Sequence, residues 1–253
     1  MASEISPTLI QALGLHDSAP DWPQLREALG LHQPPQILFA ALERHPDGLP
    51  PPHLPDWSEG GVSSPHHLHF FKMSVDDQQA ALELQAELNR PVPSAGWLSQ
   101  LHALQSRNPN VVQLFNYESV WLRRQGDVEG ARALTEAVLT RFPGEVFAAC
   151  ALAGYYLAKG DTANIEVMFN RQYELESATP RRFNALELSS FYGIMAWFHL
   201  LKGRLLRAGA CISIVHLTRP KDPFLVNLSA WLLQEPEAGL LELHRVLKLE
   251  GHV

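Results

Sequence analysis

Apolar residues recur at helical spacing along most of the chain, from about residue 74 to the end. Prolines and N-cap residues divide this stretch into consecutive segments, as at Pro91–Ser94 and Asn108–Pro109. Strand alternation is absent apart from His67–Met73, where a strand is the less favoured reading, so the pattern indicates an all-α fold class. The predicted helices cover residues 74–89, 95–107, 111–125, 128–141, 145–158, 162–176, 180–202, 204–218, 223–233 and 236–249.

The first 65 residues differ from the rest because they contain eleven of the chain's 19 prolines. Three short helices are predicted there, over residues 6–13, 21–30 and 35–45, followed by a long loop or linker over 46–66. So few apolar residues could not hold an independent domain together. The sequence therefore predicts a helical N-terminal extension with a Pro-rich linker over residues 1–70, and one helical repeat domain over 71–253.

A short sequence repeats along the helical part. Arg124-Gln125-Gly126-Asp127 returns as Ala158-Lys159-Gly160-Asp161, and a looser copy, Leu201-Lys202-Gly203-Arg204, follows. The first two glycines are 34 residues apart, and this period is typical of stacked helical hairpins. Small residues, which let two helices cross closely, fall at matching places in the hairpins: Ser119, Ala153, Ala196, Ala131 and Ala208.

At these residues the chain resembles the tetratricopeptide repeat family, best over 112–145 and 189–222 and less closely over 146–179. The sequence departs from the family's pattern at Glu118, where a large apolar residue is usual, and at Ile165, where a small one is usual. The resemblance implies antiparallel hairpins stacked as a right-handed α-α superhelix, with first helices lining a concave groove. The positions that would face this groove are Asn116, Val120, Arg123, Phe147, Cys150, Leu157, Trp197, Leu200 and Leu201.

Charge and composition exclude some classes of function for this chain. The formal net charge is −7, and no block of basic residues occurs, which argues against direct binding of nucleic acid. No apolar run reaches the 18 to 20 residues needed to span a membrane, and the N-terminus does not resemble a secretion signal. The two cysteines, Cys150 and Cys211, fit buried reduced thiols, so a cytoplasmic location is expected.

The strongest candidates for chemistry are three neighbouring histidines, His66, His67 and His69. Imidazoles this close together could hold a transition metal, but an exposed polar loop is the favoured reading because no Cys or His partner stands at a finger-like spacing. Nucleophile elbows, phosphate loops and dinucleotide-binding glycine patterns are all missing from the sequence. We therefore expect no enzyme activity, no cofactor and no metal.

The function expected is that of a non-catalytic scaffold, which binds a protein or peptide through the helical-repeat groove. The partner-binding residues would be Asn116, Arg123, Phe147, Leu157, Trp197 and Leu200. An alternative is a regulatory or sensor module that acts with a DNA-binding transcription regulator; an enzyme with an unrecognised site is a third. The apolar groove also leads us to expect that the N-terminal segment packs on the repeat region, within one chain or by exchange in a homodimer.

Overall fold

The computed structural model describes residues 35–44, 48–49, 54–58, 66–88, 90, 93–178, 182–202, 204–220 and 222. The chain divides into two compact units, and the division falls between Leu152 and Ala153, inside one helix. Residues 62–152 form the first unit, which we call the middle unit. The second combines the stretches before and after it, and we call it the split unit.

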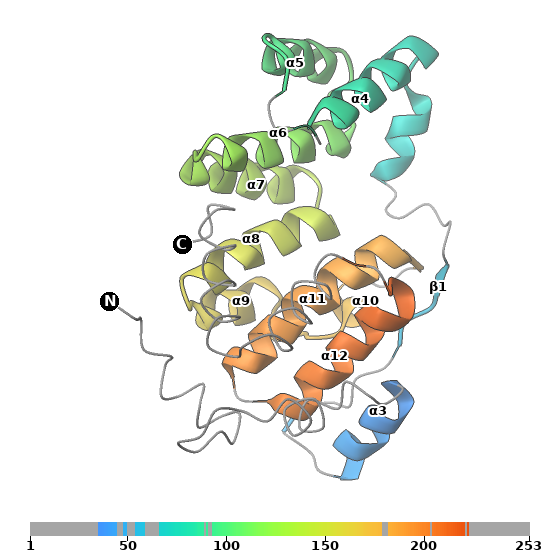
Figure 1. Ribbon diagram of the computed structural model, residues 1–253, viewed down its shortest axis with the longest axis vertical. Coiled ribbons are helices and arrows are strands. Elements are labelled where there is room, and N and C mark those ends of the chain that lie inside the picture. The colour runs from blue at the N-terminus through green and yellow to red at the C-terminus, as the bar shows by residue number, and fades with distance from the viewer. Residues whose placement is uncertain are drawn as a thin grey trace. The chain divides into compact units, whose positions relative to one another are not determined.

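The described residues are mostly helical, as the pattern predicts, and their helices and strands are as follows (Figure 1). The middle unit contains η1 (His67–Lys72), α4 (Val75–Leu88), α5 (Trp97–Arg107), α6 (Val112–Arg124), α7 (Val128–Arg141) and the start of α8 (Val146–Ala158). The split unit contains α3 (Pro35–Arg44), β1 (Trp57–Ser58), the end of α8, α9 (Thr162–Met168), α10 (Leu175–Ala178), β2 (Phe183–Asn184), α11 (Ala185–Leu201) and α12 (Leu205–Thr218).

The turn between α6 and α7 shows why the repeated sequence makes a hairpin. Gly126 has φ 79°, a left-handed conformation that glycine adopts without steric cost. Asp127 then caps α7, because its carboxylate accepts a hydrogen bond from the Gly130 N–H at 2.9 Å. Helices α6 and α7 pack side by side along their length (Figure 1). The second copy behaves alike, since Gly160 has φ 67° and Asp161 caps α9.

Small residues occupy the crossing of α6 and α7, as expected. Ser119 and Ala131 are buried, and the Ser119 hydroxyl lies 3.1 Å from the Thr135 hydroxyl on the facing helix. Thr135 donates its own proton to the Ala131 carbonyl, so Ser119 is the donor between the two side chains. The close approach therefore leaves these two hydroxyls hydrogen-bonded as well as buried.

Helices α4, α5 and α6 enclose the main apolar core of the middle unit. Trp97 is its largest member, and its indole N–H donates to the Leu84 carbonyl at 2.9 Å. Its ring also stacks on Trp121, with centroids 6.3 Å apart. The core residues are Met73, Ala81, Leu84, Leu88, Trp97, Leu101, Leu104, Val111 and Leu114.

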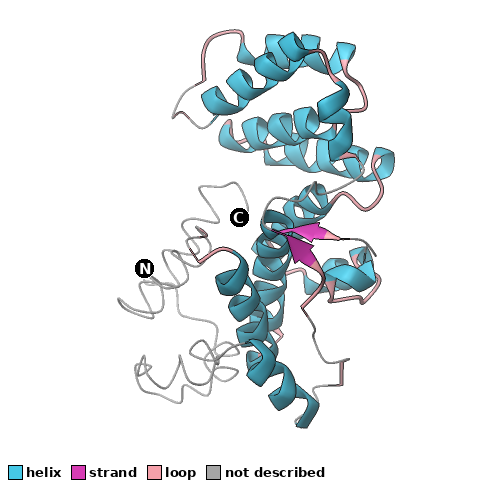
Figure 2. Cartoon of the chain, turned by 90° about the vertical axis from the view of Figure 1, so that its right-hand side faces the viewer, coloured by secondary structure: helices cyan, strands magenta, loops and turns pink. Residues whose placement is uncertain are grey.

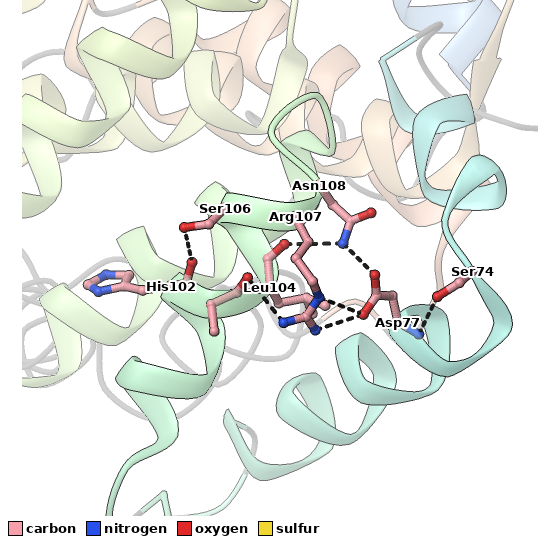
Figure 3. Close-up of polar contacts among 8 residues, drawn as sticks. Ser74, Asp77, His102, Leu104, Ser106, Arg107 and Asn108 are labelled. Carbon is pink, nitrogen blue, oxygen red and sulfur yellow. Dashed lines mark hydrogen bonds and ion pairs between the residues drawn. The ribbon is translucent and has the colours of Figure 1, made fainter.

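A polar network fastens the start of α4 to the end of α5 (Figure 3). The Arg107 guanidinium donates to Asp77 Oδ1 at 2.7 and 3.2 Å, and the Asn108 amide donates to Asp77 Oδ2 at 2.9 Å. Ser74 caps α4 by accepting a hydrogen bond from the Asp77 N–H. The hydrogen bond from Arg107, followed by that from Asn108, holds the pKa of Asp77 below its ordinary value.

The split unit is built around α11 and α12, which pack against each other and bury Ala196 and Ala208. Helix α3 packs on α12 through Leu38 and Leu42, which meet Ala210. This part of the N-terminal segment therefore packs on the helical region within one chain. In addition, Trp57 and Ser58 pair in parallel with Phe183 and Asn184, which makes the two-stranded sheet in Figure 2.

Two predicted helices have wrong bounds. The helix expected over 162–176 ends at Met168, because Asn170 and Arg171 have φ 49° and 55° and turn the chain back before α10. The helix expected over 180–202, with Thr179 as its cap, begins instead at Ala185. Its cap is Asn184, which exchanges hydrogen bonds with Glu187 in a capping box.

Other expectations are corrected or lie beyond the described residues. His67–Met73 contains a 3₁₀ helix, and the linker expected over 46–66 includes the short strand β1. The predicted helices over 6–13, 21–30, 223–233 and 236–249 fall outside the described residues. By the division into units, the described residues 35–58 group with those from 153 onward.

Candidate functional site

The histidine-rich segment before α4 packs onto the face of the middle unit where Phe147, a predicted groove position, lies. In a 3₁₀ helix, residues three apart share a face. His67, Phe70 and Met73 accordingly turn inward, while Leu68 and Phe71 on the opposite face are exposed. The expectation of an exposed polar loop is therefore wrong for His67, which is only 9% exposed.

Three contacts hold His67 in place. Its ring stacks on Phe147, with centroids 5.6 Å apart and planes within 4° of parallel. Its Nε2 lies 3.1 Å from Glu145 Oε1, and its carbonyl accepts a hydrogen bond from the Gln113 amide at 3.3 Å. The face thus contacts the His67 imidazole through both a ring stack and a polar contact, and it also binds the main-chain carbonyl of the same residue.

The neighbouring His66 contacts the turn between α7 and α8. Its Nε2 lies 3.1 Å from the Pro143 carbonyl, and its ring meets Phe142 edge-on at a centroid distance of 5.4 Å. The Arg141 guanidinium lies over the rings of both Phe142, on this turn, and Phe115, on α6. Both histidines are therefore engaged by side chains of the α7–α8 region.

Glu145 connects this segment to α8. Its carboxylate is completely buried. One carboxylate oxygen lies beside His67, and the other accepts a hydrogen bond from the Ala148 N–H. Its carbonyl accepts from Ala149, which places Glu145 at the N-cap of α8. A negative side chain there is also favoured by the helix dipole. One buried carboxylate therefore both caps a helix and fixes the histidine segment.

The predicted groove positions on α6 continue the face that begins at Gln113. Gln113, Asn116, Val120 and Arg123 follow one another at intervals of three or four residues, so they share one side of α6. All four are half-buried, and Val120 packs against the α4–α5 core. The described residues provide no hydrogen-bond partner for the Asn116 amide.

The remaining predicted site residues lie elsewhere. Cys150 is buried within α8. Leu157, Trp197 and Leu200 belong to the split unit, where Trp197 is half-buried and Leu157 and Leu200 are 9% and 2% exposed. Within the middle unit, the structure brings together Phe147 and the α6 positions with His67 and Glu145, which the sequence reasoning did not include in the groove.

Glu118, the departure from the repeat pattern, is explained by its partners on α5. The Gln105 amide donates to Glu118 Oε2 at 2.7 Å, and His102 Nε2 lies 2.9 Å from Oε1. Gln105 donates to the Leu114 carbonyl as well, at 3.2 Å. A carboxylate therefore replaces the usual apolar residue by making polar contacts between α5 and α6.

The split unit also contains buried titratable side chains, and some of these pair with one another. The Tyr192 hydroxyl donates to Glu174 Oε2 at 3.0 Å, and Arg207 Nη1 lies 3.7 Å from Glu174 Oε1. Burial raises the pKa of the nearby Cys211 thiol well above its ordinary value. Since the thiolate is the nucleophile, this cysteine is held in its unreactive form.

The described residues contain no group of three His, Cys, Asp or Glu side chains that could hold a metal ion, so His66, His67 and His69 do not form such a group. Among the described helices, none has both the length and the apolar character needed to cross a membrane.

Comparison with known proteins gives no relative: the chain matches no family model, no curated protein and no solved structure.

Proposed function

We propose that the protein is a non-catalytic interaction scaffold of tetratricopeptide-like hairpins, whose α6 face and α8 start bind a segment of a protein partner. The observation that carries the proposal is the seating of His66–Met73 on this face. The contacts there include a hydrogen bond to a main-chain carbonyl, an aromatic stack and a polar contact with a carboxylate. These interactions are the ones by which helical grooves recognise peptides.

The hairpin architecture supports the same proposal. The α6–α7 hairpin has the glycine turn, the aspartate cap and the small crossing residues that the family resemblance implies. Asn116 lies on the face beyond Gln113 with an amide that no described residue uses. The proposal also includes two features that the family resemblance implies. These are the right-handed superhelix and a contribution of Leu157, Trp197 and Leu200 to binding.

The test is a selection of peptides from a random display library on the full-length protein, followed by affinity measurements by fluorescence anisotropy. Replacing one central contact of a peptide interface commonly costs 2 kcal/mol or more. We therefore expect Asn116→Ala and Phe147→Ala to weaken binding by roughly tenfold or more. Asn110→Ala, a matched change in the exposed turn before α6, serves as the control and should leave the affinity unchanged.

Circular dichroism of each variant separates loss of binding from loss of structure. Failure to enrich any peptide, or enriched peptides whose affinity is the same for the wild type and both face variants, would count against the proposal.

A further inference from the structure

A cluster of cationic side chains lies in the split unit, where the turn between α11 and α12 meets the end of α9. Lys202 Nζ lies 2.9 Å from Glu166 Oε1, and the guanidinium carbon of Arg204 lies 5.9 Å from the centre of the Tyr173 ring. The turn after α9 brings a third cation, Arg171, next to Glu166, because the Arg171 backbone N–H donates to the Glu166 carbonyl at 2.7 Å. None of these residues belongs to the interaction face described above.

The cluster has more positive than negative charge. The hydrogen bond from Lys202, followed by the charges of Lys202, Arg204 and Arg171, keeps the pKa of Glu166 below its ordinary value. Three cations therefore act on a single carboxylate, which leaves a local excess of two positive charges. This excess stands out in a chain whose formal net charge is −7.

Arg204 has a donor that the described structure does not satisfy. Its Nη1 is buried and has no hydrogen-bond partner among the described residues. A buried guanidinium donor without an acceptor is costly, and such groups in folded proteins call for an explanation such as a bound ion. Lys202 and Arg171, in contrast, are solvent-exposed, so the cluster is reachable from outside.

The start of α12 adds to the same positive field. Arg204 is the N-cap of this helix, and its side chain makes no capping hydrogen bond. The first backbone N–H groups of this 14-residue helix therefore lack intrahelical acceptors at the Arg204 end. A cation at a helix N-terminus is unfavourable by itself, whereas an anion bound between the two would be favoured by both.

We propose that Arg171, Lys202 and Arg204 form a binding site for an oxyanion group, a phosphate or a carboxylate. The planar guanidinium of Arg204 can donate two parallel hydrogen bonds to such a group, and Lys202 and Arg171 neutralise its charge. The Tyr173 ring stacks on Phe198 with the ring centroids 5.2 Å apart, and the Arg204 guanidinium lies over the Tyr173 ring. This site does not depend on the interaction function proposed above.

The experiment titrates inorganic phosphate, and in a second arm acetate, into the full-length protein at constant ionic strength. Binding is followed by NMR of the arginine Nε–Hε groups. We expect saturable binding, weakened by about tenfold or more in Arg204→Gln because a charge-assisted hydrogen bond is lost. Lys202→Gln and Arg171→Gln, both at exposed positions, should weaken it as well, while Glu166→Gln should tighten it several-fold by removing the competing carboxylate.

Arg132→Gln on α7 is the matched control, since Arg132 pairs with Glu129 and Glu136 in the other unit. Saturation by both anions assigns a general oxyanion site, and saturation by phosphate alone assigns a phosphate site. The proposal is overturned if neither anion saturates the wild type, or if the Glu166, Lys202 and Arg204 variants bind with the same affinity as Arg132→Gln.

Discussion

The Glu145 side chain connects two parts of the middle unit that are far apart in the sequence. It is completely buried, caps α8 through Ala148 and lies beside the ring of His67, 78 residues earlier in the chain. Buried carboxylates persist only when such partners satisfy them. The residue thus couples the first turn of a helix to the segment that covers the proposed binding face.

Removing this carboxylate should therefore be costly. We predict that Glu145→Ala lowers the free energy of unfolding by about 2 kcal/mol, because it removes a helix cap and leaves polar groups unpaired. Glu145→Gln, which keeps the shape and one acceptor, should cost less. The measurement is urea unfolding of each variant beside Glu83→Ala, an exposed position on α4. Equal midpoints for Glu145→Ala and Glu83→Ala would show that the cap and the His67 contact contribute nothing.

Asp77 predicts a specific dependence of stability on pH. Its pKa is lowered in the folded protein, first by the hydrogen bond from Arg107 and then by that from Asn108. A group with a depressed folded pKa contributes stability that is fully present above its unfolded pKa and is lost as the pH falls through the folded pKa. The window lies at and below the ordinary value of 3.8.

The corresponding variant is Asp77→Asn. We expect its urea midpoint to be lower than that of the wild type at pH 7, and the difference to shrink when both are measured near pH 3. Added salt should reduce the difference at pH 7, because the contact is solvent-exposed. A difference that is the same at both pH values would contradict the assigned role of the charge.

At the scale of elements, the helix crossings depend on small residues at fixed places. Ala131 on α7 is 3% exposed at the crossing with α6, whereas Ala137 on the same helix is solvent-exposed. Ala131→Leu should lower the free energy of unfolding by roughly 1–3 kcal/mol through overpacking. Ala137→Leu makes the identical change on the open side and should be nearly neutral in the same thermal or urea measurement. Similar losses in both variants would mean that the register of the hairpin is misassigned.

The turn between α6 and α7 permits a cleaner test of backbone conformation. A side chain added at Gly126 would meet no atom within 4 Å, so any loss must come from φ 79° itself. We predict that Gly126→Ala lowers the free energy of unfolding by about 1 kcal/mol. Gly126→Asn should lose less, because asparagine tolerates the left-handed region. Chemical denaturation ranks the three proteins, and an asparagine variant less stable than the alanine variant would reverse this reasoning.

The bounds of the helices show which features of the fold can be predicted from the sequence. Helices α4, α6, α7 and α12 lie within one or two residues of their predicted bounds, since apolar periodicity and local caps specify them. The predicted start of α11 is wrong because Pro180 after Thr179 imitates a helix start, while the capping box at Asn184 and Glu187 is the stronger signal. The end of α9 could not be foreseen, because arginine rarely adopts the left-handed conformation that Arg171 has.

For the whole molecule, the limits come from contacts between distant parts of the chain. The pairing of His67 with Glu145 spans 78 residues and has no local signature, so the histidines were expected in an open loop. The grouping of the stretch around α3 and β1 with residues beyond 153 likewise rests on tertiary packing. The positions on α6 and at Phe147 could be named from the repeat pattern, but not the segment that lies on them.

The central claim is that the α6 face and the start of α8 are the surface through which this scaffold binds its partner. Hydrogen–deuterium exchange of the full-length protein, with and without a saturating peptide from the display selection, tests it most directly. We predict slower exchange in α6 and at the first turn of α8, since a bound peptide would stabilise these two elements. Protection confined to other helices, with the α6 and α8 amides exchanging at the same rate in both samples, would contradict the claim.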